Sequence, residues 1–199
     1  RGPGVSGVSG TDATGAARRW VLCVAVRPGT LRVDRLAKGA NIVILSFPAR
    51  LRALATERPD APAVTCSGVT LTRAQLDSRS NRLARELDSY GIRAGSFVTV
   101  AVPNSVDWFV AYVACWKLGA IPQPVSAKLP GRELAAIVEL AGSTVVIGAP
   151  DEAFDQLPET IVHLPLGHEP PTEFTDEALP DAVSPAWKAP PSGGSTGLP

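Results

Sequence analysis

The stretch that decides the fold is residues 97–125, FVTVAVPNSVDWFVAYVACWKLGAIPQPV. Its first six residues are apolar or β-branched and predict a buried strand. The Pro-Asn-Ser turn that follows can cap a helix, and residues 106–118 carry a broad apolar helical face that stops at Gly119. Residues 121–125 form a short extended piece that is rich in proline. A strand, a helix and another strand in this order are typical of a right-handed βαβ crossover.

The sequence on both sides continues this alternation. Thr72 and Gln75 form a capping box at the start of a helix that Gly91 ends. The remaining predicted elements are a helix over 47–55, a hairpin over 63–71, a further helix over 132–140 and a strand over 144–147. The predicted fold class is therefore α/β, with a partial, mostly parallel sheet and flanking helices.

Two regions have a different composition. Residues 1–45 begin with Gly, Ser, Thr and Ala and show no clear apolar periodicity, so we expect an N-terminal extension that is flexible or foreign to the fold. Residues 46–199 are expected to form the folded body. Within it, residues 151–181 carry nine acidic side chains and no Lys or Arg, which predicts a solvated surface excursion with one short strand at 160–164.

Composition excludes several classes of protein. Hydrophobic residues make up 45% of the chain, which favours a globular fold, and the 19 basic and 19 acidic residues cancel, which gives no sign of a nucleic-acid or anionic-membrane partner. The three cysteines lie too far apart for a zinc knuckle or a redox pair, and a reducing cytoplasm is the simplest location. The apolar run at 20–26 is shorter than the roughly 20 residues of a membrane span, so no transmembrane segment is predicted.

Structural roles explain most of the other conspicuous side chains. We expect a buried aromatic stripe on one helix, an inert buried thiol, two surface cations and two histidines in the acidic loop rather than in a metal site. The aromatic stripe is Trp108, Phe109, Tyr112 and Trp116, and the buried thiol is Cys115. The surface cations are Lys117 and Lys128, and the histidines of the acidic loop are His163 and His168.

The string with the clearest chemistry is residues 192–199, SGGSTGLP. Its three glycines let the backbone approach a ligand closely, and successive N–H groups can form a concave nest for phosphate oxygens. The hydroxyl groups add further hydrogen-bond donors. The spacing is not that of a Walker A loop. Composition alone leaves two interpretations open, a phosphate-binding loop and a flexible linker.

A family resemblance favours the phosphate loop. SGGSTGLP resembles the signature [ST]-[SG]-G-[ST]-T-G-x-P-K-G of adenylate-forming (AMP-binding) enzymes, and residues 58–126 are similar to the opening of that superfamily in sequence and spacing. The resemblance covers about residues 47–199, so this region looks like the first part of the large N-terminal domain of such an enzyme. The Ser-Gly-Gly form after WKAPP looks most like fatty-acid or bile-acid type acyl-CoA synthetases.

The resemblance implies a two-step reaction with ATP, Mg²⁺ and coenzyme A, in which a carboxylic acid becomes an acyl-adenylate and then a thioester. Six residues would hold the ATP phosphates: Ser192, Gly193, Gly194, Ser195, Thr196 and Gly197. Counterparts of the family's later motifs are missing, so no catalytic or metal-binding residue is predicted, and the chain is expected to be a truncated fragment that is inactive alone. The alternatives are an acyl-AMP ligase that loads a carrier protein and a non-catalytic remnant or interaction module.

Overall fold

The computed structural model describes residues 46–191. The predicted extension 1–45 and the predicted phosphate-loop residues Ser192–Gly197 lie outside this range. The helices are α1 Phe47–Glu57, α2 Arg73–Ser89, α3 Val106–Lys117, α4 Gly131–Ala141 and α5 Asp151–Phe154. The strands are β1 Pro62–Cys66, β2 Val69–Thr72, β3 Phe97–Ala101, β4 Ile121–Pro124, β5 Val145–Gly148 and β6 Val162–Leu164.

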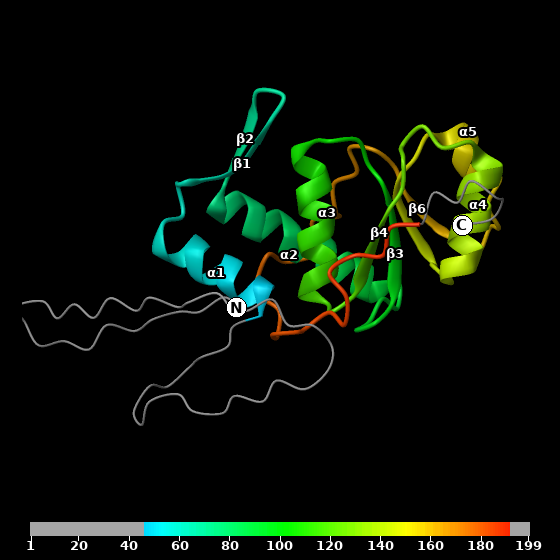
Figure 1. Cartoon of the computed structure of the whole chain (residues 1–199). Helices are drawn as coiled ribbons and strands as arrows, with labels where there is room; N and C mark the ends of the chain where they lie inside the picture. The colour runs from blue at the N-terminus through cyan, green and yellow to red at the C-terminus, as the bar shows by residue number, and fades with distance from the viewer. Residues whose placement is uncertain (1–45, 192–199) are drawn as a thin grey trace, which may run out of the picture. The chain divides into compact units, whose positions relative to one another are not determined.

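The centre of the fold is a four-stranded parallel sheet with the order β4-β3-β5-β6. Figure 1 shows α3 and α4 on opposite faces of this sheet. Alternate strand residues explain both layers: Val98, Val100 and Ile147 pack with α2 and α3, whereas Ala101 and Val146 pack with α4. Because both faces are covered, the strands are mostly apolar, and the buried polar side chains of Thr99 and Gln123 hydrogen-bond to each other across β3 and β4. The predicted α/β class with a parallel sheet is confirmed.

Local signals in the sequence set the helix boundaries. The side chain of Thr72 accepts a hydrogen bond from the backbone N–H of Gln75, and the Gln75 side chain accepts one from Thr72, so the capping box at the start of α2 is confirmed. Ser105 caps α3 by accepting from the N–H of Trp108. Gly91 follows α2 with a φ of 84°, a conformation that glycine adopts without strain.

The predicted hairpin is also present. Strands β1 and β2 pair antiparallel outside the main sheet, and the hairpin contacts α2 and α3. On α3, Trp108 stacks on Tyr112 at a ring separation of 3.7 Å, and Tyr112 meets Trp116 edge-on at 5.6 Å. The aromatic stripe is therefore core packing for the most part, although Phe109 is 40% exposed.

The prediction that Lys117 is a surface cation is wrong. Its side chain is buried, and Nζ donates to the backbone carbonyl and Oδ1 of Asp77 and to Oδ1 of Asn81, at 2.9, 2.7 and 2.6 Å. Burial lowers the pKa of the Lys117 ammonium, and the hydrogen bond and charge of Asp77 oppose that shift. Three acceptors from α2 thus hold a buried charge at the end of α3.

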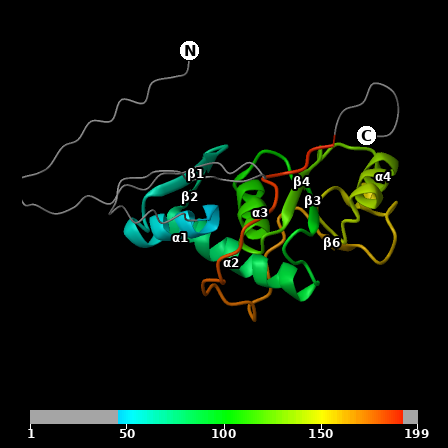
Figure 2. The same ribbon diagram turned by 60° about the horizontal axis from the view of Figure 1, so that its bottom comes forward.

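The predicted acidic surface excursion over residues 151–181 is confirmed in two respects: its nine acidic side chains are exposed, and the expected short strand is present. Its close attachment to the folded body was not part of the prediction. Residues 151–154 form α5 and Val162–Leu164 joins the parallel sheet as β6. Residues 165–191, which we call the strap, run back along α2 and then beside α3 (Figure 2). Side chains of α1 and α2 bind backbone carbonyls of the strap: Arg52 to Leu179, Asn81 to Asp176, Arg82 to Pro170 and Arg85 to Glu177. Composition missed this because the bonds use main-chain oxygens, which every residue type offers.

Candidate functional site

The strap leads toward the predicted phosphate loop, and Pro191 is its last described residue. Two points fix the direction of this segment. The carbonyl oxygen of Val183 lies 3.2 Å from the position that a Cβ on Gly119 would take, and the N–H of Ala189 donates to the carbonyl of Pro122 at 3.1 Å. Gly119 precedes β4 and Pro122 lies within it. The strap therefore runs along the outer edge of β4 toward the carboxyl end of the sheet.

Aromatic packing holds the same segment. Trp187 lies 4.0 Å from Trp116 and 4.8 Å from Phe47 between ring centroids, and Phe47 meets Trp116 edge-on at 4.9 Å. The indole Nε1–H of Trp116 donates to the carbonyl oxygen of Trp187 at 2.9 Å. We call Phe47, Trp116 and Trp187 the aromatic cluster. It joins the start of α1, the end of α3 and the strap.

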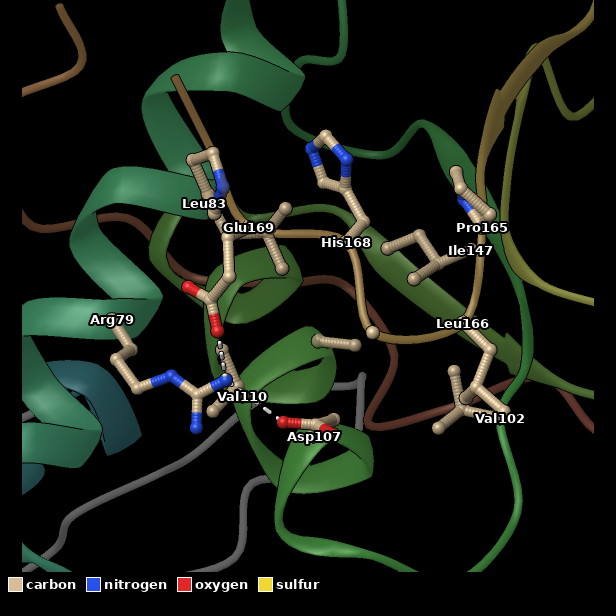
Figure 3. A pocket seen from close by; sticks show the side chains of 13 residues that line it. Arg79, Leu83, Val102, Asp107, Val110, Ile147, Pro165, Leu166, His168 and Glu169 are labelled. Atoms are coloured by element: carbon tan, nitrogen blue, oxygen red, sulfur yellow. Dashed lines mark hydrogen bonds and ion pairs between the residues drawn. The ribbon is translucent and has the colours of Figure 1, made fainter. Parts of the chain in front are cut away.

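A shallow hollow lies where β3, β5 and β6 end (Figure 3). Its empty volume of about 450 Å³ includes open solvent, so it is a surface depression and not an enclosed cavity. From β3 the chain passes through α3 to β4, which pairs with one edge of β3. It then passes through α4 to β5, which pairs with the opposite edge of β3. The hollow thus occupies the topological switch point, the place where open α/β sheets most often bind ligands. Its apolar walls include Leu83, Val102, Val110, Ile147 and Leu166.

The polar wall of the hollow is already paired. Nη2 of Arg79 lies 2.9 Å from Oδ1 of Asp107 and 2.8 Å from Oε1 of Glu169 (Figure 3). Asp107 stands in the first turn of α3, where the helix dipole favours a carboxylate. Two carboxylates more than offset the single positive charge of the guanidinium, so the group acts as a brace between α2, α3 and the strap rather than as an open anion site. No local sequence signal marks Arg79 or Glu169, because these two residues lie 90 positions apart.

The two histidines have structural partners. Nε2 of His168 lies 2.8 and 2.9 Å from the carboxylate oxygens of Glu86, which is buried in α2 and also accepts from the Tyr90 hydroxyl at 3.2 Å. His163 Nε2 lies 2.7 Å from the carbonyl oxygen of Gly148. The interpretation of His168 as a loop residue in solvent is therefore wrong: it ties the strap to α2.

Two further groups were weighed for chemistry. Cys115 is fully buried, and burial raises the pKa of its thiol to about 12, so it stays protonated and inert as predicted. Over residues 46–191, His, Cys, Asp and Glu nowhere gather in a group of three or more that could hold a metal ion.

The comparisons identify the family. A match to the family described as "AMP-binding enzyme" covers residues 51–199. The chain therefore belongs to the AMP-binding family of adenylate-forming enzymes. Over the part of the chain that the structure describes, none of the helices combines the length and the apolar character that crossing a membrane requires.

Its relatives catalyse different reactions. The chain is 38% identical over 117 residues to an olefin β-lactone synthetase of Stenotrophomonas maltophilia, which covers 53% of this chain and 21% of the relative. It is 36% identical over 102 residues to the long-chain-fatty-acid–CoA ligase FadD13 of Mycobacterium tuberculosis, covering 51% and 20%. It is 31% identical over 128 residues to surfactin synthase subunit 3 of Bacillus subtilis, covering 63% and 10%. The chain thus spans about a fifth or less of these relatives.

Solved structures give the same picture. The nonribosomal peptide synthetase FmoA3 bound to α-methyl-L-serine-AMP matches with a TM-score of 0.63 and 26% identity, over 72% of this chain and 16% of that one. The inhibitor-bound N-terminal domain of FACL13 from Mycobacterium tuberculosis matches with a TM-score of 0.54 and 32% identity, over 60% and 33%. The fold is that of the N-terminal domain of adenylate-forming enzymes, and the fatty-acid type is not singled out.

Proposed function

We propose that this chain is the phosphate-binding first part of an ATP-dependent acyl-CoA synthetase that acts on a carboxylic acid of the fatty-acid type. The observation that carries the proposal is the family match over residues 51–199, which includes the glycine-rich string at 192–197. FadD13, a relative of comparable identity to the others, is a long-chain-fatty-acid–CoA ligase, which supports the choice of substrate. The WKAPP sequence before Ser-Gly-Gly supports the same choice.

In the proposed reaction, the carboxylate oxygen of the acid attacks the α-phosphorus of ATP, and pyrophosphate leaves. Backbone N–H groups of Gly193, Gly194 and Gly197, with the hydroxyl groups of Ser195 and Thr196, would bind the β- and γ-phosphate oxygens. Negative charge grows on these oxygens as the bond to the α-phosphorus breaks. Donors placed in advance around such charge contribute the largest single part of many rate enhancements.

In the second step, the thiol of coenzyme A would attack the acyl carbon of the adenylate, forming a thioester and releasing AMP. A carrier-protein thiol is the alternative acceptor, because the similar proteins include surfactin synthase subunit 3 and FmoA3, a nonribosomal peptide synthetase. The second candidate is therefore an acyl-AMP ligase that loads a carrier protein. A non-catalytic interaction module is the third.

ATP–pyrophosphate exchange separates the catalytic candidates from the third, because it reports adenylate formation without a thiol acceptor. It should be run on residues 1–199 and on the longest open reading frame that encodes them, with a panel of fatty, aromatic and amino acids. We expect acid-dependent exchange from the longer protein with fatty acids and none from residues 1–199 alone. Fatty-acid exchange followed by thioester formation with coenzyme A supports the acyl-CoA synthetase. Exchange with amino acids only, or with no acid, contradicts it.

A further inference from the structure

The buried ammonium of Lys117 lies beside a small hollow between α1, α2 and the strap. Its side chain is 5% exposed, and Asp77 and Asn81, which accept hydrogen bonds from Nζ, line the same hollow. On the strap side the hollow is lined by residues 179–181. We call residues 176–181 the lid. The lid therefore helps to keep water away from a charged amine.

The polar bonds that hold the lid come from side chains of α1 and α2, beside which this part of the strap runs (Figure 2). Their acceptors are three main-chain carbonyls and two carboxylates of the lid. Asn81 and Ser78 bind Asp176, Arg85 binds Glu177, and Arg52 binds Leu179 and Asp181. Within residues 46–191, no backbone N–H of the lid donates to a backbone carbonyl. The lid is thus attached without any regular backbone pairing.

Apolar packing adds one further contact. Leu179 is half-buried and packs against the main core cluster, whereas the other five lid residues are exposed. Segments with few buried apolar contacts and exposed hydrogen bonds open at a free energy well below that of global unfolding. The lid has both properties, so it can separate from α1 and α2 while the sheet stays intact.

The side chain of Asn81 connects the lid to the buried charge. Its Oδ1 accepts from Nζ of Lys117 at 2.6 Å, and its Nδ2 donates to the carbonyl oxygen of Asp176 at 2.8 Å. An ammonium can only donate and a carbonyl can only accept, so both partners require the same orientation of this amide. The charged lysine and the closed lid therefore stabilise each other.

We propose that the lid gates Lys117: it conceals the amine when closed and exposes it to acyl donors when it opens as a local unit. An acylated Lys117 would have no positive charge and only one N–H, so it could not satisfy Asp77 and Asn81 together. Acylation would therefore hold the lid open. The gate does not depend on the proposed adenylation reaction.

Timed acetylation of residues 1–199 with the N-hydroxysuccinimide ester of acetic acid tests the gate. The neutral amine attacks the ester carbonyl carbon, a C–N bond replaces the C–O bond to hydroxysuccinimide, and the amine proton goes to solvent. Peptide mapping by mass spectrometry should show Lys117 reacting far more slowly than the exposed Lys128. In low urea the Lys117 rate should change little. A rate that rises with urea as steeply as global unfolding requires would overturn the local opening.

Three variants locate the opening. Leu179→Ala removes the apolar contact of the lid and should raise the Lys117 rate about fivefold, the factor that corresponds to about 1 kcal/mol of lost burial. Leu166→Ala makes the same change at an exposed strap position outside the lid and should leave the rate unchanged. Val138→Ala weakens the core on the α4 face of the sheet and should also leave it unchanged. No acceleration by Leu179→Ala, or equal acceleration by Val138→Ala, would overturn the proposal.

Proteolysis tests the link between the lysine and the lid. Brief acetylation should modify the exposed Lys128 and Lys188, and longer treatment should add Lys117. A glutamate-specific protease should then cleave after Glu177 faster in chains acetylated at Lys117 than in the briefly treated protein, because an open segment fits a protease better. Equal cleavage rates would show that the lid closes over an acylated lysine, and would contradict the gate.

Discussion

Replacing Asp77 with alanine should lower the free energy of unfolding strongly, although it removes only a small side chain. Asp77 provides two of the three acceptors of the buried Lys117 ammonium, its backbone carbonyl and Oδ1. The substitution removes Oδ1 at 2.7 Å and leaves a charge whose side chain is 5% exposed. Breaking a buried ion pair from one side costs roughly 3–5 kcal/mol, since the remaining charge has lost its partner but not its desolvation.

Two smaller effects reduce that figure. Alanine is a better helix former than aspartate by up to about 0.7 kcal/mol. Asn81 and the Asp77 carbonyl still accept from Lys117 after the substitution. The expected loss of unfolding free energy is therefore about 3 kcal/mol, toward the low end of the range for broken buried pairs.

The assay is urea unfolding of residues 1–199 followed by tryptophan fluorescence, with variants compared at an unchanged m-value. The matched control is Asp88→Ala, which breaks the ion pair with Arg93 at the same N–O distance of 2.7 Å but on the surface. That control should cost less than about 1 kcal/mol. A loss for Asp77→Ala equal to that for Asp88→Ala would refute the reasoning, because it would show that water or a rearranged side chain solvates Lys117.

Burial raises the pKa of the Cys115 thiol from an ordinary value of 9.0 to about 12. Between these pH values the folded state binds more protons than the unfolded state. The free energy of unfolding should therefore fall as pH rises, by up to about 1.4 kcal/mol per pH unit. Cys115→Ala should remove that part of the slope in unfolding titrations, and an unchanged slope would contradict the assignment. Gly148→Ala should destabilise the fold by several kcal/mol, because the φ of Gly148 is 81° and a Cβ there would lie 2.6 Å from the Ala101 carbonyl oxygen. A near-normal melting temperature of this variant would be inconsistent with that packing. Limited proteolysis should trim residues 1–45 and leave a protected remainder starting near Ser46; sustained protection of Arg18 would show that the boundary is misplaced.

The elements that could be predicted from the sequence are those specified by local chemistry. The capping box at Thr72, the cap at Ser105 and the stop at Gly91 each depend on residues within a few positions, and all three are present. The βαβ order followed from the apolar runs, because a strand buried on both faces has little choice of composition. The proline-rich sequence 121–125 predicts only a short extended piece. The structure shows why β4 tolerates prolines: β4 is an edge strand, and the backbone nitrogens of Pro122 and Pro124 face away from β3.

The parts that could not be predicted depend on contacts between residues distant in sequence. Lys117 was assigned to the surface because lysine is usually solvated, and nothing near it in sequence reveals Asp77, 40 residues earlier. The acidic composition of residues 151–181 correctly predicts exposed side chains, but it does not reveal that main-chain oxygens of the strap bind Asn81, Arg82 and Arg85 of α2. The hollow at the switch point carries no motif. By contrast, the predicted phosphate loop depends on its motif and on the family match, and its geometry stays a prediction.

The most direct test of the central claim is the effect of Thr196→Val on ATP–pyrophosphate exchange in the longest open reading frame that encodes this chain. Valine keeps the shape of threonine and removes the hydroxyl group, and the loss of one such donor should slow exchange by roughly a hundredfold or more, equivalent to about 2.7–4 kcal/mol. Thr172→Val, at an exposed strap position, is the matched control and should leave the rate unchanged. Thiolysis of an acyl-adenylate supplied ready-made should be affected much less than exchange. Unchanged exchange in the Thr196→Val protein would contradict the assignment of residues 192–197 to the ATP phosphates and favour the linker.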